Sequence, residues 1–248
     1  MLQQIKRHMA YAVAALALLI TACVPQIRET APAPPPVAQQ LPENFPSPYY
    51  AQAAAQGKSV YRIDPARSLV TITVRRGGSL ARLGHDHVVA SHSVQGYALP
   101  DEGRADLYVP LNELSVDESA LRVEAGLDTQ PSEADIAGTR ANMLDKVLQT
   151  QEFPFALIRV SGMGQLPLGI SETGVRLTVG ITLHGITRTF EVPAQRESGS
   201  GELSVLSVAG WFEFNQSDFG ITPFSVLGGM IKVQDRINLR FRIYARPS

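Results

Sequence analysis

The stretch from Val175 to Val192 constrains the fold of this chain more than any other. Its first half alternates apolar residues with polar or small ones, and the apolar set is Val175, Leu177, Val179, Ile181 and Leu183. A period of two is typical of a β-strand with one buried face and one solvated face. His184-Gly185 then supplies turn chemistry, because glycine reaches positive φ without a steric cost. The alternation resumes from Thr187 to Val192, so the stretch predicts a long antiparallel hairpin in a β-rich domain.

The same alternation recurs along residues 58–248. Three further strands are predicted with one apolar side, formed by Val70, Ile72 and Val74; by Ala105, Leu107 and Val109; and by Ile237, Leu239, Phe241 and Ile243. Another strand is predicted from Phe155 to Val160, after Pro154. The segment from Glu202 to Phe214 is apolar on both faces, which predicts that another element covers it. Predicted strands do not alternate with predicted helices, and such alternation would be the sign of a parallel sheet. We therefore expect an all-β fold, one antiparallel barrel of about eight strands.

Four short motifs occur in order across this domain. They are Tyr61-x-Ile63-Asp64-x-x-x-Ser68, Glu152-Phe153-Pro154, the run from Ile181 to Arg188 that contains Leu183-His184-Gly185, and Ser217-Asp218-Phe219-Gly220. Together they resemble the YceI-like family of lipid- or polyisoprenoid-binding proteins. The resemblance implies a lipocalin-like barrel around an apolar cavity that holds a long isoprenoid tail.

One short helix is predicted among the strands, near residues 132–148. Ser132 can cap it, and Glu133 and Asp135 fall in the first turn, where acidic groups favour the helix dipole. An apolar stripe recurs at helical spacing, formed by Ile136, Met143, Leu144, Val147 and Leu148. The simpler interpretation is a helix that covers one end of the barrel. The alternative is a lid whose Met143, Leu144 and Leu148 touch a ligand.

The inward rows supply the candidate ligand-binding residues, although hydrophobicity alone assigns which rows face inward. They are Val70, Ile72, Val179, Ile181, Trp211, Leu239 and Phe241, with Met143 and Leu144 added from the helix. The expected ligand is an isoprenoid lipid or a quinone. An eight-stranded barrel is at the size where the interior is either filled by side chains or holds one slender ligand. Both outcomes stay open.

His85-Asp86-His87 is the sharpest polar cluster. On a strand, His85 and His87 project from one face and could chelate a divalent metal, while Asp86 points away. Zinc sites need three or four ligands, and no acidic residue or cysteine lies at a spacing typical of a third zinc ligand. Two histidines could also ligate haem, hydrogen-bond a quinone, or shape a polar loop at the barrel mouth. A metal- or haem-binding protein is therefore the alternative function.

Charge and motif content exclude several function classes. The formal net charge is −1, and removing a leader that holds Lys6 and Arg7 leaves 20 basic against 23 acidic side chains, about −3. This balance gives no electrostatic footprint for nucleic acid. The signatures G-x-S-x-G, H-E-x-x-H and C-x-x-C are absent, so we identify no catalytic residue and expect no enzyme.

The N-terminal region is predicted to be a targeting signal followed by a spacer. Lys6 and Arg7 precede an apolar core from Met9 to Ile20, which is too short to span a bilayer. Leu19-Ile20-Thr21-Ala22-Cys23 resembles a bacterial lipobox, so we expect a signal peptide over 1–22 and lipidation of Cys23. Residues 23–57 are then a proline-rich tether. Val24 favours sorting to the outer membrane, and the expected location is its periplasmic face in the cell envelope. A homodimer is left open.

Overall fold

The computed structural model describes residues 41–163, 175–197 and 205–248. The expected signal peptide, Cys23 and the first part of the tether lie outside the described residues. Leu41–Ser248 forms one compact unit. Within the described ranges, no helix is both long enough and apolar enough to cross a membrane.

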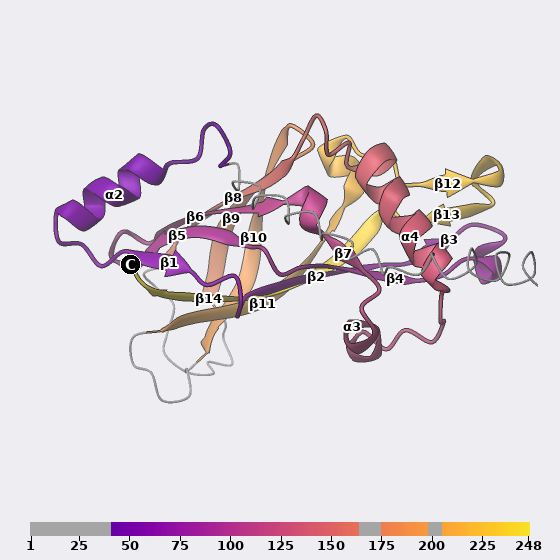
Figure 1. Ribbon diagram of the computed structural model, residues 1–248, viewed down its shortest axis with the longest axis horizontal. Helices are drawn as coiled ribbons and strands as arrows, with labels where there is room; N and C mark the ends of the chain where they lie inside the picture. The colour runs from indigo at the N-terminus through magenta and orange to yellow at the C-terminus, as the bar shows by residue number, and fades with distance from the viewer. Residues whose placement is uncertain (1–40, 164–174, 198–204) are drawn as a thin grey trace, which may run out of the picture. The chain divides into compact units, whose positions relative to one another are not determined.

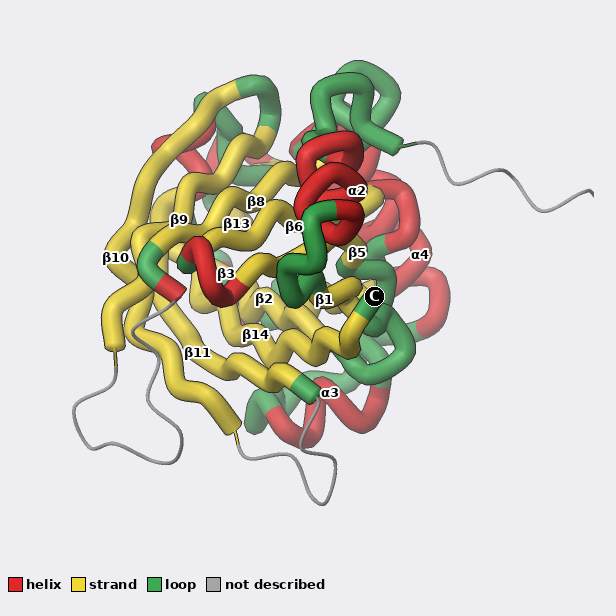
Figure 2. Tube along the Cα trace, turned by 90° about the vertical axis from the view of Figure 1, so that its left-hand side faces the viewer, coloured by secondary structure: helices red, strands yellow, loops and turns green. Residues whose placement is uncertain are grey.

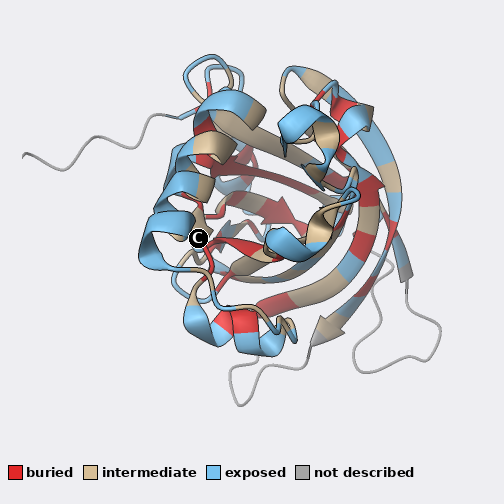
Figure 3. Ribbon diagram, turned by 90° about the vertical axis from the view of Figure 1, so that its right-hand side faces the viewer, coloured by how far each residue is buried: buried red, intermediate tan, exposed pale blue. Residues whose placement is uncertain are grey.

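Eight strands close into a ring in which every neighbouring pair is antiparallel (Figure 1). In ring order they are β1 (Tyr61–Ile63), β5 (Gln95–Leu99), β6 (Arg104–Pro110), β8 (Phe155–Ser161), β9 (Val175–Leu183), β10 (Ile186–Glu197), β11 (Leu206–Asn215) and β14 (Arg236–Pro247). The predicted all-β barrel of about eight strands is therefore confirmed. Seen end-on, buried residues follow the strands around the barrel wall (Figure 3).

One edge of β14 has two successive partners. Its residues 238–242 pair with β2 (Leu69–Val74), and its residues 245–247 pair with β1. The sheet continues from β2 through β4 (His87–Ser91) to β7 (Ser115–Val116). The barrel therefore has two differently built ends. One is formed around β1 and β5, and the other around β2 and β4.

Short elements decorate these two ends. The helices are α2 (Ser47–Ala55), α3 (Ser119–Glu124) and α4 (Glu133–Asn142), with α4 continuing into a π-turn, Met143–Val147. A second, three-stranded sheet joins β3 (Arg76–Gly77), β13 (Ile231–Val233) and β12 (Ser225–Val226). The 3₁₀ turns are Ala81–Leu83, Pro100–Glu102, Leu111–Glu113, Gln216–Phe219 and Leu227–Gly229. Figure 1 shows this small sheet and α4 at the opposite end of the barrel from α2.

The central hairpin forms as predicted. Leu183 pairs with Ile186 across a two-residue turn in which His184 and Gly185 have φ of 51° and 73°. Positive φ at both positions defines a type I′ turn, whose twist matches that of the flanking strands. The ring of Phe153 lies 4.5 Å from the His184 ring, so two of the sequence motifs meet at this turn.

Helix α4 begins with the predicted cap. The Ser132 hydroxyl accepts the backbone N–H of Asp135, and the Asp135 carboxylate accepts the backbone N–H of Ser132. Arg140 then donates to the carbonyl oxygens of Leu114 at 2.9 Å and Asn112 at 2.6 Å, which attaches the helix to the segment around β7. The prediction of one short covering helix is confirmed.

Helix α2 packs on the outer wall of β5 and β6 (Figure 2). Tyr50 is only 1% exposed, stacks on Tyr97 with ring centroids 5.2 Å apart, and donates its hydroxyl to Asp106 at 2.8 Å. The expected tether over 23–57 therefore overlaps the folded unit, because residues 41–57 belong to it. Composition favoured a spacer, since seven of the 17 prolines precede this helix.

Candidate functional site

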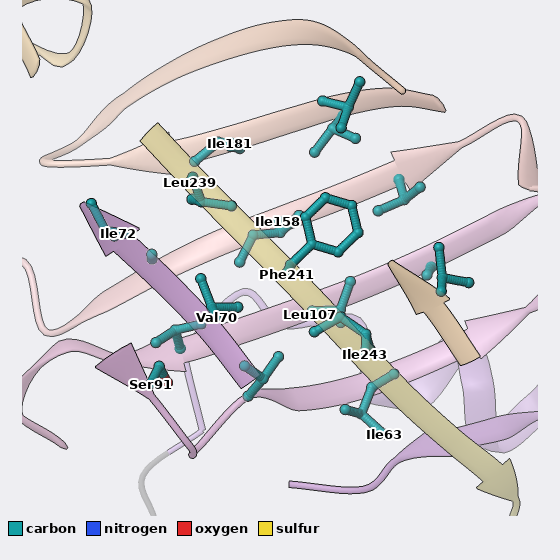
Figure 4. Close-up of a pocket in the computed structure, with 18 of the residues that line it drawn as sticks. Ile63, Val70, Ile72, Ser91, Leu107, Ile158, Ile181, Leu239, Phe241 and Ile243 are labelled. Carbon is teal, nitrogen blue, oxygen red and sulfur yellow. The ribbon is translucent and has the colours of Figure 1, made fainter. Parts of the chain in front are cut away.

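The barrel encloses an apolar cavity of about 210 Å³. Among the described residues that line it, Ser91 alone has a polar side chain. The wall is built from successive inward rows of the ring strands and of β2 and β4, as Figure 4 shows for Val70 and Ile72 on β2 and for Leu239, Phe241 and Ile243 on β14. Such a surface can bind apolar chains but offers almost no polar group to orient them.

Six of the predicted ligand-binding residues line this cavity. They are Val70, Ile72, Val179, Ile181, Leu239 and Phe241. The parity inferred from hydrophobicity therefore holds for β2, β9 and β14. In each of these strands only one face is apolar, so the pattern fixes which side is buried.

Trp211 is a correction, because it faces outward and is 58% exposed. On β11 both rows are apolar, so the sequence pattern could not decide between them. Pairing decides it: Phe212 lies opposite Leu239, and directly opposed residues share one face of a sheet. Phe212 and Phe214 thus line the cavity in place of Trp211. The expectation that another element covers both faces of this strand is wrong at Trp211.

Met143 and Leu144 do not reach the cavity. Leu144 is buried, and Met143 packs against the main core, whereas Leu148 lines the cavity wall. The packing interpretation of the covering helix therefore accounts for Met143 and Leu144. Contact with a cavity ligand is open to Leu148 alone among the three lid candidates.

Gly210 makes room for Phe241 on the cavity wall. A Cβ atom at position 210 would lie 2.6 Å from Cζ of the Phe241 ring and 2.6 Å from the carbonyl oxygen of Pro193. The ring therefore occupies the space that a side chain at 210 would fill. This absence of a side chain lets Phe241 lie against the wall of the cavity.

His87 stands at the end of the inward row of β4. The register pairs Val70 with Ser91, Ile72 with Val89 and Val74 with His87. Since opposed residues share a face, His87 continues the cavity-lining row one step beyond Val89. Its side chain is 14% exposed. His87 is therefore a polar group at the end of a wall in which Ser91 is the other polar residue of β4.

Asp117 orients the His87 ring. Its Oδ2 lies 2.6 Å from His87 Nδ1, while its Oδ1 accepts the Val88 backbone N–H at 3.0 Å and a hydrogen bond from the Arg122 guanidinium. Burial raises the pKa of Asp117, but these hydrogen bonds outweigh burial and hold the pKa below its usual value. A carboxylate at Nδ1 leaves His87 Nε2 as the ring atom without a hydrogen-bond partner among the described residues.

Asp117 also has an unusual backbone conformation, with φ of 58°. A buried non-glycine residue in the left-handed region costs energy, and such residues concentrate at functional sites. Sequence reasoning missed Asp117 and Arg122. Thirty residues separate His87 from Asp117, and no motif links them. Only the pairing of β4 with β7 brings them together.

His85 and His87 are neighbours, with ring centroids 6.2 Å apart. His85 Nδ1 is buried and has no hydrogen-bond partner within the described residues. Asp86 points away, as predicted, and its carboxylate accepts from Arg75 at 3.0 Å and from the Arg76 backbone N–H at 2.8 Å. No group of three or more metal-ligating side chains gathers in the part of the chain that the structure describes. The metal or haem alternative therefore gains no support.

A model of the YceI-like domain matches residues 61–245. The chain belongs to this family. The family predicted from the four sequence motifs is therefore confirmed. In this YceI-like protein they serve the fold: the Ser68 hydroxyl accepts the Tyr244 backbone N–H at 3.0 Å, and Phe219 is fully buried.

Two solved structures are similar to this YceI-like protein. A polyisoprenoid-binding domain from Saccharophagus degradans, implicated in plant cell wall breakdown, has a TM-score of 0.54 and 13% identity, and the alignment covers 76% of this chain and 98% of that one. Burkholderia cenocepacia BcnA has a TM-score of 0.48 and 14% identity, with coverage of 73% and 98%. A search of curated proteins gives no significant match. At this identity the first likeness supports the fold alone.

Proposed function

We propose that this YceI-like protein binds the tail of an isoprenoid or another amphiphilic lipid in its barrel cavity, as a binding protein and not an enzyme. The observation that carries the proposal is the continuous apolar wall, in which Ser91 is the only polar side chain among the described lining residues. Each buried methylene of a tail would contribute about 0.8 kcal/mol. Several isoprene units therefore supply enough affinity to exceed the cost of ordering the tail. The polyisoprenoid-binding relative from Saccharophagus degradans supports this choice.

The polar head of the ligand is proposed to lie beside His85 and His87. His87 follows the cavity-lining row of β4, and Asp117 fixes its ring, with no hydrogen-bond partner for Nε2 in the part of the chain that the structure describes. A neutral imidazole held in this way accepts a hydrogen bond at Nε2. A hydroxyl-bearing head group, such as that of a quinol, matches this atom. A quinone carbonyl would instead need a protonated ring nitrogen.

Attachment to the membrane is proposed to occur through a lipid on Cys23. The support is the sequence Leu19-Ile20-Thr21-Ala22-Cys23, with Val24 favouring the periplasmic face of the outer membrane. Burial of more than one acyl chain, at about 0.8 kcal/mol per methylene, would hold the protein there. After a high-salt wash, which weakens contacts held by surface charge, the variant Cys23→Ala should appear in the soluble fraction, measured by cell fractionation. Retention of this variant in the salt-washed membrane fraction would contradict the anchor.

The binding test is the lipid that co-purifies with the full chain, identified by mass spectrometry of an organic extract. Val179→Asp puts a charge in the cavity wall and should abolish lipid, whereas Thr189→Asp, on the exposed face of the same hairpin, should retain it. Because a buried charge can also unfold the barrel, Ala156→Phe provides a second block that fills the cavity with an apolar ring. Lipid content that is equal in all three folded variants would refute the proposal.

The head-group proposal has its own variant. His85→Ala should leave the amount of bound tail unchanged and alter the head groups found in the extract. If His85→Ala instead removes a stoichiometric metal or haem, seen by elemental analysis or absorbance, and no lipid is ever found, the metal function is the correct one.

A further inference from the structure

A group of exposed apolar side chains lies at the end of the barrel that α4 covers. Four of the seven large hydrophobic residues that are exposed in the described chain occur here: Leu83 at 57%, Val226 at 41%, Leu227 at 60% and Met230 at 44%. They come from the 3₁₀ turn Ala81–Leu83 and from the β12–β13 hairpin. We call these four residues the apolar tip. Their concentration matters, because exposed hydrophobic residues scattered singly need no explanation.

The apolar tip is one structural unit. The Leu80 backbone N–H donates to the Met230 carbonyl at 2.8 Å, and Val226 pairs with Ile231. Gly78, with φ of +93°, lies so close to the hairpin that a Cβ atom there would be 2.4 Å from the Met230 carbonyl oxygen. Segments separated by about 150 residues in sequence therefore hold these side chains together.

Leu227 is costly in two ways. Its φ is 52°, and it precedes Gly228 and Gly229, which also have positive φ. A leucine in this conformation costs about 1–2 kcal/mol. It also keeps a large apolar side chain in water. Asparagine or glycine would avoid both costs, so packing within the described chain gives no reason for leucine here.

Basic residues flank the apolar tip. Arg82 precedes Leu83, and Lys232 follows Ile231; both are exposed, and neither forms an ion pair among the described residues. The nearby Arg76 is different, since its guanidinium lies 3.8 Å from carboxylate oxygens of Asp86 and Asp128. Exposed apolar residues bordered by free cations are the pattern of a surface that inserts into an anionic lipid interface.

The apolar tip is connected to the cavity wall, because β13 of its hairpin pairs with β3. Strand β3 follows β2, whose Val70 and Ile72 line the cavity and whose Val74 lies opposite His87. Figure 1 shows the small sheet extending beyond the ends of β2 and β4, beside α4. A surface that holds the apolar tip would therefore face the His87 end of the barrel.

We propose that the apolar tip inserts into the surface of an anionic phospholipid bilayer and holds this end of the barrel against it. The contact does not depend on a lipid on Cys23 or on a ligand in the cavity, so it is tested separately from the proposed function. A tail that leaves the bilayer would then meet the cavity without crossing water.

The test uses the full chain and fluorescence quenching by vesicles of phosphatidylcholine and phosphatidylglycerol with brominated acyl chains. Trp211 is the only tryptophan and lies exposed on the barrel wall, so the unmodified protein is the control. The reporter variant combines Trp211→Phe with Val226→Trp. We expect strong quenching of the tryptophan at 226, because the apolar tip would place it among the brominated chains. We expect little quenching of Trp211, which lies outside the apolar tip. Attachment through the N-terminus alone would not insert the apolar tip and would not quench the tryptophan at 226.

Charge reversal sharpens the result. Arg82→Glu and Lys232→Glu in the reporter variant should each raise the lipid concentration for half-maximal quenching about 30-fold, because each substitution removes one positive charge and adds one negative charge. Arg62→Glu, an exposed arginine on β1 at the other end of the barrel, should leave it unchanged. Val179→Asp should also leave it unchanged if it folds, which separates this contact from cavity binding.

Two results would overturn the proposal. One is quenching at 226 that does not exceed that of Trp211. The other is a self-associating protein that Leu227→Gln converts to a monomer in light scattering, without any quenching at 226. That result would assign the apolar tip to contact between two copies of the chain.

Discussion

Asp106 and Asp117 are both buried carboxylates attached to the barrel wall. They differ in whether every hydrogen-bond partner is used up within the protein. Asp106 lies on the outer face of β6 and accepts from Tyr50, from Arg104 at 2.7 Å and from Arg159 at 2.9 Å. All three donors are side chains of the protein, and the hydrogen bond from Tyr50 attaches α2 to the barrel wall. Asp117 also has three partners, but one is a histidine whose second nitrogen has no partner among the described residues.

The difference shows what separates a structural carboxylate from one that supports a site. For both residues, burial raises the pKa and the surrounding donors outweigh it, so both pKa values fall below the usual value. Burial and pKa therefore do not distinguish the two. The distinguishing feature is whether the chain of hydrogen bonds ends within the protein or at an open atom beside the cavity.

Asp117→Ala should have the largest effect. Arg122 is 9% exposed at its side chain, so removing Asp117 leaves a buried cation without its carboxylate. Breaking a buried pair in this way typically costs about 3–5 kcal/mol. Urea unfolding should show this loss of stability. A loss below about 1 kcal/mol would mean that Arg122 finds water or another acceptor, and that Asp117 is not required for the fold.

Asp106→Ala should cost less, about 2–3 kcal/mol in the same measurement. Arg159 is 68% exposed and Arg104 is 31% exposed, so both cations can return to water when the carboxylate is removed. Hydrogen exchange should show faster exchange in α2, with β9 and β10 unchanged. If Asp106→Ala destabilises the protein more than Asp117→Ala does, the contrast in cation burial does not control stability.

Acid should remove part of both contributions, and by less than either alanine substitution, because a protonated carboxyl keeps some of its hydrogen bonds. The folded pKa values lie below the ordinary value of 3.8. The stabilisation is therefore complete above that pH and is lost as the pH falls through the depressed folded values. Unfolding free energies between about pH 5 and pH 2 should fall less steeply in Asp106→Asn and in Asp117→Asn. Slopes equal to that of the unmodified protein would contradict both assignments.

His87→Gln should have the smallest effect on stability, below about 1 kcal/mol, since Asp117 keeps Val88 and Arg122 as donors. We expect its effect in the bound lipid, whose head-group composition should change. Tyr50→Phe, which removes one donor from Asp106, is the matched control and should leave the bound lipid unaltered. A lipid profile that His87→Gln does not change would make His87 structural, like Tyr50.

The strands were predictable where one face alone was apolar. The inward rows of β2, β9 and β14 follow from alternation, and the cap of α4 follows from Ser132 and Asp135. Trp211 was not predictable, because β11 is apolar on both faces and only its register with β14 selects Phe212. The His85–His87 pair was visible in the sequence, but Asp117 was not. Its role depends on strand pairing over thirty residues, as the docking of Tyr50 depends on Asp106, 56 residues away.

The two successive partners of β14 have a consequence for motion. The ring closes through β1, which pairs with β14 over three residues and with β5 over two, whereas β9 and β10 pair over nine. Short pairings open at lower free energy than long ones, so local opening concentrates where they occur. The amides of Tyr61–Ile63 should therefore exchange with solvent before those of the long hairpin. Local opening at these two short pairings would separate β1 from its neighbours while the rest of the barrel stays folded.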